Sequence, residues 1–357
     1  DRENWVIFAS GRASEPKKRK PARSPGMSGS RQRHPPLDEK RLAMFAPGKI
    51  HSTNTQTVNS LDYSNNGDYL VTASEDNSVR LYTCNTGTQK QAVFCKRNGV
   101  SQARFTHHSN SIICASRVAS KQESLRYLSL HDNVYLRYFP GHTDRVTQVE
   151  MCPVDDTFMS GSMDHTVRFW DLRSSKAAAI LETKAPPVIG YDPQGLILAV
   201  FTARNLLSLY DIRTFTKGPF STFNVDPGNS NSMWTHLKFT PDGDHILAST
   251  TGGKMFLYDS FKGNIKHTFE GRANPKMSRY KAKMPSLTFT PSISPDGQFI
   301  LWGNCQGIFA YGIASGKFVK YWKVETPYAI GWNPRKLMFA SAGKKLILWQ
   351  PPRPKRR

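Results

Sequence analysis

A short unit recurs along most of the chain, and it constrains the fold more than any other feature of the sequence. In its first copy, two turns separate three strand-like segments, Val58–Tyr63, Tyr69–Ser74 and Ser78–Tyr82, and the first of these turns is centred on Gly67. Corresponding turns follow at intervals of 39 to 54 residues, at Ser109, Asp155, Gly195, Gly243, Gly297 and Lys336. Seven copies of one unit therefore account for nearly all of the chain between residues 42 and 350.

Each copy has the length and the turn chemistry of a β-propeller blade, with three visible strands and room for a fourth. Pro241-Asp242-Gly243 and Pro295-Asp296-Gly297 combine a fixed φ at proline with a glycine that admits positive φ. Strands such as Thr166–Trp170 are rich in the β-branched and aromatic residues that sheets favour. We therefore predict one all-β, seven-bladed propeller over residues 42–350, although a length of 357 residues alone would suggest two or three domains.

The last copy shows only three strands, Tyr328–Trp332, Leu337–Ser341 and Lys345–Trp349. Residues 42–47, Leu-Ala-Met-Phe-Ala-Pro, are the segment that we expect to supply its outer strand. Such pairing would join the two ends of the repeat array and remove an open sheet edge. Residues 1–41 and 351–357 then remain outside the ring, as disordered basic tails.

The two ends carry +10 of the net charge of +22. Residues 1–36 contribute +6 and residues 351–357 contribute +4, in stretches rich in proline, serine and glycine that cannot bury a core. Prolines flank a cation cluster that is typical of a nuclear-import signal, and the C-terminus offers a weaker one. A solvated tail is the alternative, and if Met27 is the natural start, residues 1–26 would not be native. The import-signal candidates are Lys17, Lys18, Arg19, Lys20, Lys355, Arg356 and Arg357.

Composition and motifs argue against several classes of function. No apolar run approaches the 18–20 residues, roughly, of a membrane span, and the five cysteines are scattered without a CxxC pair. The sequence has no glycine-rich phosphate loop, defined catalytic carboxylate pair or His/Cys metal cluster. We therefore expect a non-enzymatic intracellular protein without catalytic residues, metal or cofactor.

The third copy carries the clearest family signature. Gly141-His142 precedes its first strand, and Trp170-Asp171 ends its third. This framing resembles the WD-repeat family. The resemblance implies a buried hydrogen-bonded tetrad that stiffens the blade, formed by His142, Ser160, Asp164 and Trp170.

Two further segments narrow the resemblance. Leu125–Asn133 contains Arg-Tyr-Leu-Ser-Leu-His-Asp-Asn, and Leu136–His142 contains Arg-Tyr-Phe-Pro-Gly-His. General blade consensus predicts neither run, and over residues 42–350 the chain resembles the WD-repeat protein 82 family of COMPASS-type histone methyltransferase subunits. The resemblance implies a nuclear scaffold that holds a SET-domain methyltransferase acting on histone H3 lysine four, together with other subunits of that complex. It also implies a link to the phosphorylated C-terminal repeat of RNA polymerase II.

Two surfaces are candidates for partner contacts. Arg137, Tyr138 and Phe139 are residue types that anchor interfaces, and we place them at the connection entering the third blade. Packing of the aromatic pair between blades is the alternative. An acid-free stretch within Gly271–Ser286 could bind phosphate or nucleic acid, or remain a solvated loop. Its candidates are Arg272, Lys276, Arg279, Tyr280, Lys281 and Lys283.

Three functional hypotheses remain open at this stage. The first is the methyltransferase scaffold. The second is a subunit of a transcription termination or mRNA 3′-end processing complex, with phosphatase or processing partners and direct RNA contact. The third is a WD-repeat substrate receptor of a ubiquitin ligase. Direct nucleic-acid binding is secondary, because much of the positive charge lies in the tails.

Overall fold

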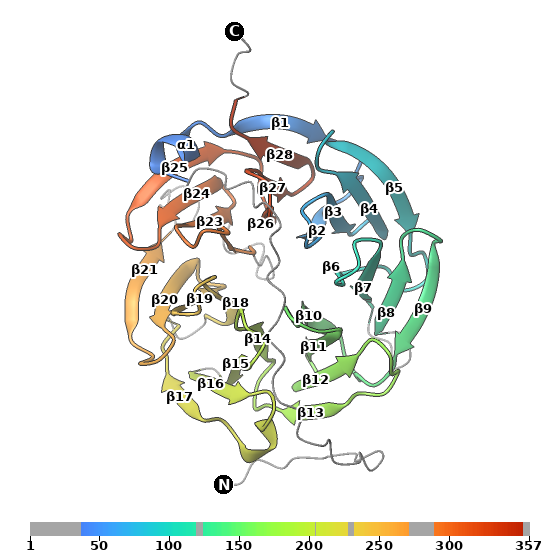
Figure 1. The fold of residues 1–357 in the computed structure, drawn as a ribbon, viewed down its shortest axis with the longest axis vertical. Coiled ribbons are helices and arrows are strands. Elements are labelled where there is room, and N and C mark those ends of the chain that lie inside the picture. Colours follow the sequence, from blue (N-terminus) through green and yellow to red (C-terminus); the bar gives the residue numbers. More distant parts are fainter. Residues whose placement is uncertain (1–36, 119–123, 204, 228–231, 271–288, 353–357) are drawn as a thin grey trace, which may run out of the picture.

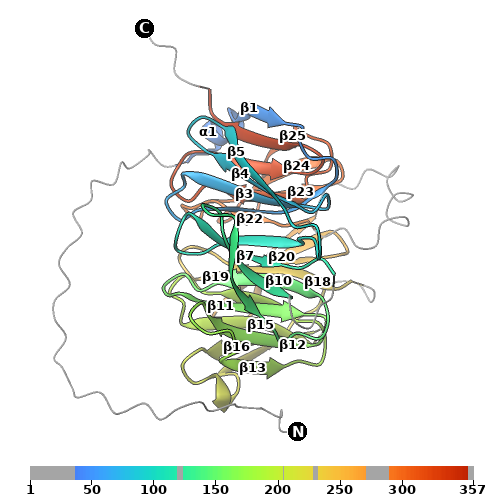
Figure 2. The same cartoon turned by 90° about the vertical axis from the view of Figure 1, so that its right-hand side faces the viewer.

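The computed structural model describes residues 37–118, 124–203, 205–227, 232–270 and 289–352. Within these ranges, 28 strands form seven four-stranded antiparallel sheets. The sheets are arranged around a central axis (Figure 1), and from the side they form a thick disc (Figure 2). The predicted seven-bladed all-β propeller is confirmed. No helix in the described part of the chain is long and apolar enough to cross a membrane.

Each of the first four blades uses four strands that are consecutive in the sequence, ordered from the axis outwards. Their bounds are β2 Val58–Tyr63, β3 Tyr69–Ser74, β4 Ser78–Thr83 and β5 Thr88–Phe94; β6 Gln102–Phe105, β7 Ser111–Ala115, β8 Leu125–Ser129 and β9 Val134–Phe139; β10 Val146–Met151, β11 Thr157–Ser162, β12 Thr166–Asp171 and β13 Ala179–Glu182; and β14 Val188–Tyr191, β15 Ile197–Ala203, β16 Leu206–Asp211 and β17 Ser221–Asn224.

Blades five and six follow the same order, whereas blade seven takes its outer strand from the beginning of the described chain. The bounds are β18 Trp234–Phe239, β19 His245–Thr250, β20 Lys254–Asp259 and β21 Ile265–Glu270; β22 Ser292–Ile293, β23 Phe299–Asn304, β24 Gly307–Gly312 and β25 Phe318–Lys323; and β26 Ala329–Trp332, β27 Phe339–Ala342, β28 Leu346–Gln350 and β1 Ala46–His51. Two short helices, α1 Glu39–Ala43 and the 3-10 turn η1 Phe215–Lys217, accompany the strands.

The turns between the first and second strands explain why the repeat is visible in the sequence. Gly243 and Gly297, the glycines of the two Pro-Asp-Gly turns, have φ values of 81° and 72°. Residues with a Cβ rarely adopt a positive φ, so glycine is the residue that allows the chain to reverse direction there. In the second of these turns, the Ser294 Oγ–H donates to Asp296 at 2.5 Å, which closes the turn locally.

An N-terminal strand closes the last blade, as predicted, but it begins four residues later than expected. The outer strand is Ala46–His51, which pairs antiparallel with β28, so only Ala46 and Pro47 of the predicted residues 42–47 belong to it. Leu42 and Ala43 belong to α1 instead, which lies beside β25 in Figure 1. Leu42 and Phe45 of this stretch are buried, whereas Ala43 and Met44 are exposed.

The predicted disordered tail also ends earlier than residue 41. Leu37 is buried, and Asp38 caps α1 because its Oδ1 accepts the Arg41 N–H at 2.6 Å. Leu42 and Phe45 are buried in a cluster with Trp322 and Phe339. Hydrophobic burial and a helix cap therefore order this segment against blades six and seven. Residues 1–36 and 353–357, including all of the import-signal candidates, lie outside the described residues.

Candidate functional site

The four tetrad residues of blade three lie in one chain of hydrogen bonds. The Trp170 Nε1–H donates to Ser160 Oγ at 2.8 Å, and Ser160 Oγ lies 2.7 Å from His142 Nε2. On its other side, His142 Nδ1 lies 2.8 Å from Asp164 Oδ2. His142, Ser160 and Trp170 are almost completely buried. If the Ser160 hydroxyl donates to Nε2, the histidine carries its proton on Nδ1 and donates it to the Asp164 carboxylate. Each side-chain donor of the tetrad then has an acceptor.

The local electrostatics agree with a neutral histidine and a charged aspartate. Burial lowers the pKa of His142, and this outweighs the opposing effect of Asp164. Burial acts to raise the pKa of Asp164, but hydrogen bonds from His142, Thr166 and the Thr143 N–H lower it well below its usual range. The Ser160 hydroxyl beside this pair is completely buried and accepts the Trp170 N–H, and no group of His, Cys, Asp and Glu among the described residues could hold a metal ion. The arrangement is suited to holding strands together.

Replacing Asp164 by asparagine is expected to lower the free energy of unfolding by about 1–3 kcal/mol at pH 7. The folded-state pKa of Asp164 is depressed, so its contribution is present above the unfolded pKa of about 3.9 and is lost as the pH falls below it. Urea unfolding from pH 7 to pH 3 measures both effects, with exposed Asp156 changed to asparagine as the control. A gap between wild type and Asp164→Asn that stays constant over this range would contradict the assignment.

Contacts between neighbouring blades use polar side chains that the repeat pattern did not single out. The Gln148 amide accepts the Ile189 N–H at 3.0 Å and donates to the Ile189 carbonyl at 2.7 Å, as a strand partner would. Gln102 makes the matching contact one blade earlier, because its Oε1 accepts the Val149 N–H at 3.1 Å. A glutamine among the apolar residues of an inner strand is the sequence signal that could have indicated these contacts. These bonds fix each inner strand relative to the next.

The three residues of the predicted partner surface differ in exposure, because they alternate along one strand. Arg137, Tyr138 and Phe139 lie on the outer strand β9 of blade two, and not in a connecting loop as predicted. Phe139 is fully buried and packs against Trp170 of blade three with ring centroids 5.6 Å apart, so it is an interblade residue. Tyr138 is 40% exposed and Arg137 is half-buried. Only these two remain available to a partner.

The basic-loop candidates fall outside the described residues. Arg272, Lys276, Arg279, Tyr280, Lys281 and Lys283 all belong to the range 271–288. The structure therefore does not place them relative to the ring. Their role stays a prediction from the sequence.

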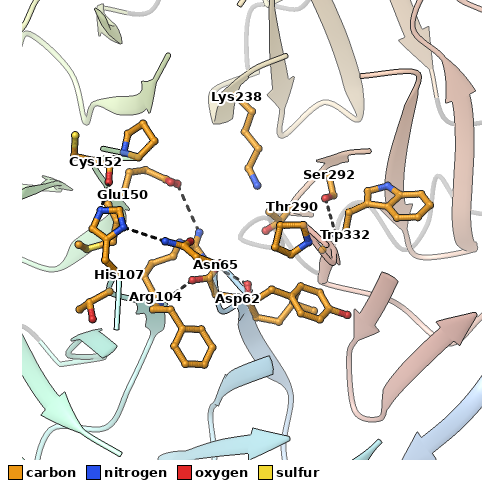
Figure 3. Close-up of a pocket in the computed structure, with 18 of the residues that line it drawn as sticks. Asp62, Asn65, Arg104, His107, Glu150, Cys152, Lys238, Thr290, Ser292 and Trp332 are labelled. Atoms are coloured by element: carbon orange, nitrogen blue, oxygen red, sulfur yellow. Dashed lines mark hydrogen bonds and ion pairs between the residues drawn. The ribbon is translucent and has the colours of Figure 1, made fainter. Parts of the chain in front are cut away.

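A polar cavity of about 320 Å³ lies at the propeller axis, and no sequence motif predicts it. Its lining comes from the inner strands and following turns of six blades (Figure 3). Asn65, His107 and Pro334 belong to turns between first and second strands, so the cavity reaches the face on which these turns lie.

Two opposite charges in this cavity lie close together. The Arg104 Nη2 lies 3.6 Å from Glu150 Oε1. Arg104 also donates from Nε to the Val149 carbonyl at 3.2 Å, and the Asp62 carboxylate accepts the Phe105 N–H at 2.8 Å. Inner-strand charges thus link blades one, two and three around the axis.

Comparison with known proteins places the fold and these motifs in a family. The model described as "WD domain, G-beta repeat" matches residues 47–83 and 133–171. WD repeat-containing protein 82 of Drosophila melanogaster is 39% identical over 88% of this chain and 97% of its own length. COMPASS component SWD2 of Saccharomyces cerevisiae is 33% identical over 80% of this chain and 88% of its own.

A further relative agrees with these two. The Set1 complex component swd2 of Schizosaccharomyces pombe is 33% identical over 68% of this chain and 67% of its own length. The similarity to the fly protein extends over 319 residues. The chain thus belongs to the WD repeat-containing protein 82 family.

Proposed function

We propose that the protein is a non-catalytic WD-repeat subunit of a nuclear Set1/COMPASS-type complex, in which it holds a SET-domain histone H3 lysine-four methyltransferase and other subunits. One observation carries the proposal: two relatives at 33% identity are named as components of COMPASS and of the Set1 complex. The geometry is compatible with a scaffold, because the tetrad and the interblade glutamines stabilise a ring whose exposed faces can present contacts.

We propose Arg137 and Tyr138 on β9 as part of the partner surface. The Arg137 Nη1–H donates to the Arg173 carbonyl of the next blade at 2.6 Å, which holds the side chain along the blade edge. Tyr138 packs against Tyr135, with ring centroids 5.6 Å apart, and keeps one face in solvent. An exposed aromatic group beside a fixed arginine is a common anchor in interfaces.

Co-purification from nuclear extract tests this surface. The double variant Arg137→Ser/Tyr138→Ser is expected to recover less methyltransferase than wild type, while Phe94→Ser on the outer strand β5 is expected to recover the same amount. Phe94 is the matched control because it is also an exposed aromatic residue on an outer strand. Equal recovery by all three proteins would remove the two residues from the proposed interface.

We further propose that the family role includes a link to the phosphorylated C-terminal repeat of RNA polymerase II, through the basic residues of the range 271–288. Their support is the sequence itself, since five cations occur there without an acid. Replacing Lys276, Arg279, Lys281 and Lys283 by serine is expected to weaken binding of a phosphorylated repeat peptide by about tenfold at low salt. Fluorescence anisotropy measures this affinity, and an unchanged value would exclude these four residues as the binding site.

A further inference from the structure

The axial cavity contains an ammonium group without a partner among the described residues. Lys238 extends from the inner strand β18, and its Nζ points into the cavity in Figure 3. No hydrogen bond or ion pair joins this nitrogen to another described side chain or backbone atom. By contrast, Lys254 in the same blade pairs with Glu270 at 2.7 Å. Lys238 is therefore a cavity-lining cation that no described acceptor contacts directly.

The neighbouring charges have other partners. Glu150 Oε1 lies near Arg104 and also accepts a hydrogen bond from the Gln148 Nε2 at 3.2 Å. Asp62 is engaged by the Phe105 N–H, and burial raises the pKa of this carboxyl, with Arg104 opposing the effect. Neither acid is in contact with the Lys238 ammonium. Their charges act on Lys238 only at longer range, together with that of Arg104.

The Lys238 side chain is half-buried in the cavity wall, so its ammonium is less well hydrated than at an open surface. Desolvation lowers the pKa of Lys238, and the acids Glu150 and Asp62 offset this only in part. A partly desolvated cation carries an energetic penalty unless a counter-ion or a hydrogen-bond acceptor contacts it. An anion that enters the cavity and contacts Nζ would remove the penalty, with the ordinary geometry of a charge-assisted hydrogen bond.

We propose that Lys238 is the anchor of a binding site for a single carboxylate group at the propeller axis. A monoanion fits better than a dianion such as phosphate, because Asp62 and Glu150 line the same cavity and would repel a second negative charge. The Thr290 hydroxyl lines the same cavity and already lies 3.1 Å from His236 Nε2. The carboxylate belongs to an acidic side chain of a partner peptide or to a small free acid. This site stands independently of which complex the protein joins.

Lysine side-chain NMR tests the site directly. Protein labelled with ¹³C at lysine Cε is titrated at constant ionic strength with acetate, with inorganic phosphate, and with a capped Gly-Glu-Gly peptide and its Gly-Gln-Gly counterpart. The Lys238 signal is assigned by its absence from Lys238→Met. Acetate is expected to shift this signal saturably, and phosphate is expected to shift it less.

The peptides distinguish the two sources of carboxylate. Saturable binding of both acetate and the Glu peptide identifies an acidic side chain as a competent ligand, whereas binding of acetate alone restricts the site to small acids. Whichever probe binds is expected to bind about tenfold more weakly to Lys238→Met. Lys262→Met, at an exposed lysine of the same blade, is the matched control and should leave binding unchanged.

Two results would overturn the proposal. One is a Lys238 signal that moves with acetate only as the Lys262 signal does, without saturation. The other is equal affinity of wild type and Lys238→Met for the probes. The wild-type titration needs no variant to fold, and thermal unfolding of Lys238→Met checks that the ring is intact before its affinity is compared.

Discussion

Replacing Trp170 by alanine is expected to lower the free energy of unfolding by about 3–5 kcal/mol. Trp170 is 1% exposed, and its ring packs between Phe139 of blade two and Phe158 of its own blade. Its indole N–H also completes the hydrogen-bond chain through Ser160. The substitution therefore removes a large buried surface, opens a cavity at a blade boundary and takes away a donor. Urea unfolding followed by circular dichroism measures the loss.

Two further variants separate these effects. Trp170→Phe keeps most of the ring but removes the donor, so it is expected to lose about 1–3 kcal/mol. Met163→Ala, at an exposed side chain of the same blade, is expected to stay within about 0.5 kcal/mol of wild type. If Trp170→Ala were as stable as Met163→Ala, the tetrad would have no structural role.

Replacing Phe45 by alanine is expected to destabilise the protein by a similar amount, about 3–5 kcal/mol, and to loosen ring closure. Phe45 is 3% exposed; its ring stacks on Phe339 at 5.4 Å and meets the edge of Trp332 at 5.6 Å. Its carbonyl accepts the Trp322 Nε1–H at 2.9 Å. The residue therefore fixes the segment that leads into β1, and without it the edge of β28 becomes available to other chains.

Unfolding and self-association should change together in this variant. Urea unfolding gives the loss of stability, and size-exclusion chromatography with light scattering detects association through the exposed edge. Met44→Ala is the matched control. Met44 is next to Phe45 in the sequence but its side chain is 50% exposed, so its replacement should change neither stability nor association. A Phe45→Ala protein that is monomeric and as stable as Met44→Ala would show that closure does not depend on this anchor.

The blade repeat could be predicted from the sequence because its determinants are local. Gly243 and Gly297 occupy turns that need positive φ, and the flanking strands carry their own β-forming residues. The closing strand could not be placed correctly, since Ala46–His51 contains Pro47 and Gly48 and is largely exposed, so it shows no alternating pattern. Its pairing with the last blade could be predicted from that blade's missing fourth strand, but no local signal specifies which residues form it.

The same distinction applies to the candidate sites. The tetrad lies within one blade, so His142 and Trp170 could be connected by a motif with fixed spacing. On β9 the side chains alternate, and Tyr138 points outwards while Phe139 points inwards; the error was to place them in a loop. The axial cavity gathers single residues such as Lys238 and Asp62 from separate blades, and only the closed ring brings them together.

Affinity purification of the tagged full-length chain from nuclear extract, followed by mass spectrometry, tests the central functional claim most directly. We expect a SET-domain methyltransferase and other COMPASS-type subunits to be enriched over a mock purification, at comparable levels with wild type and with the control variant Phe94→Ser. Enrichment of a ubiquitin-ligase adaptor without any methyltransferase subunit would contradict the proposed function.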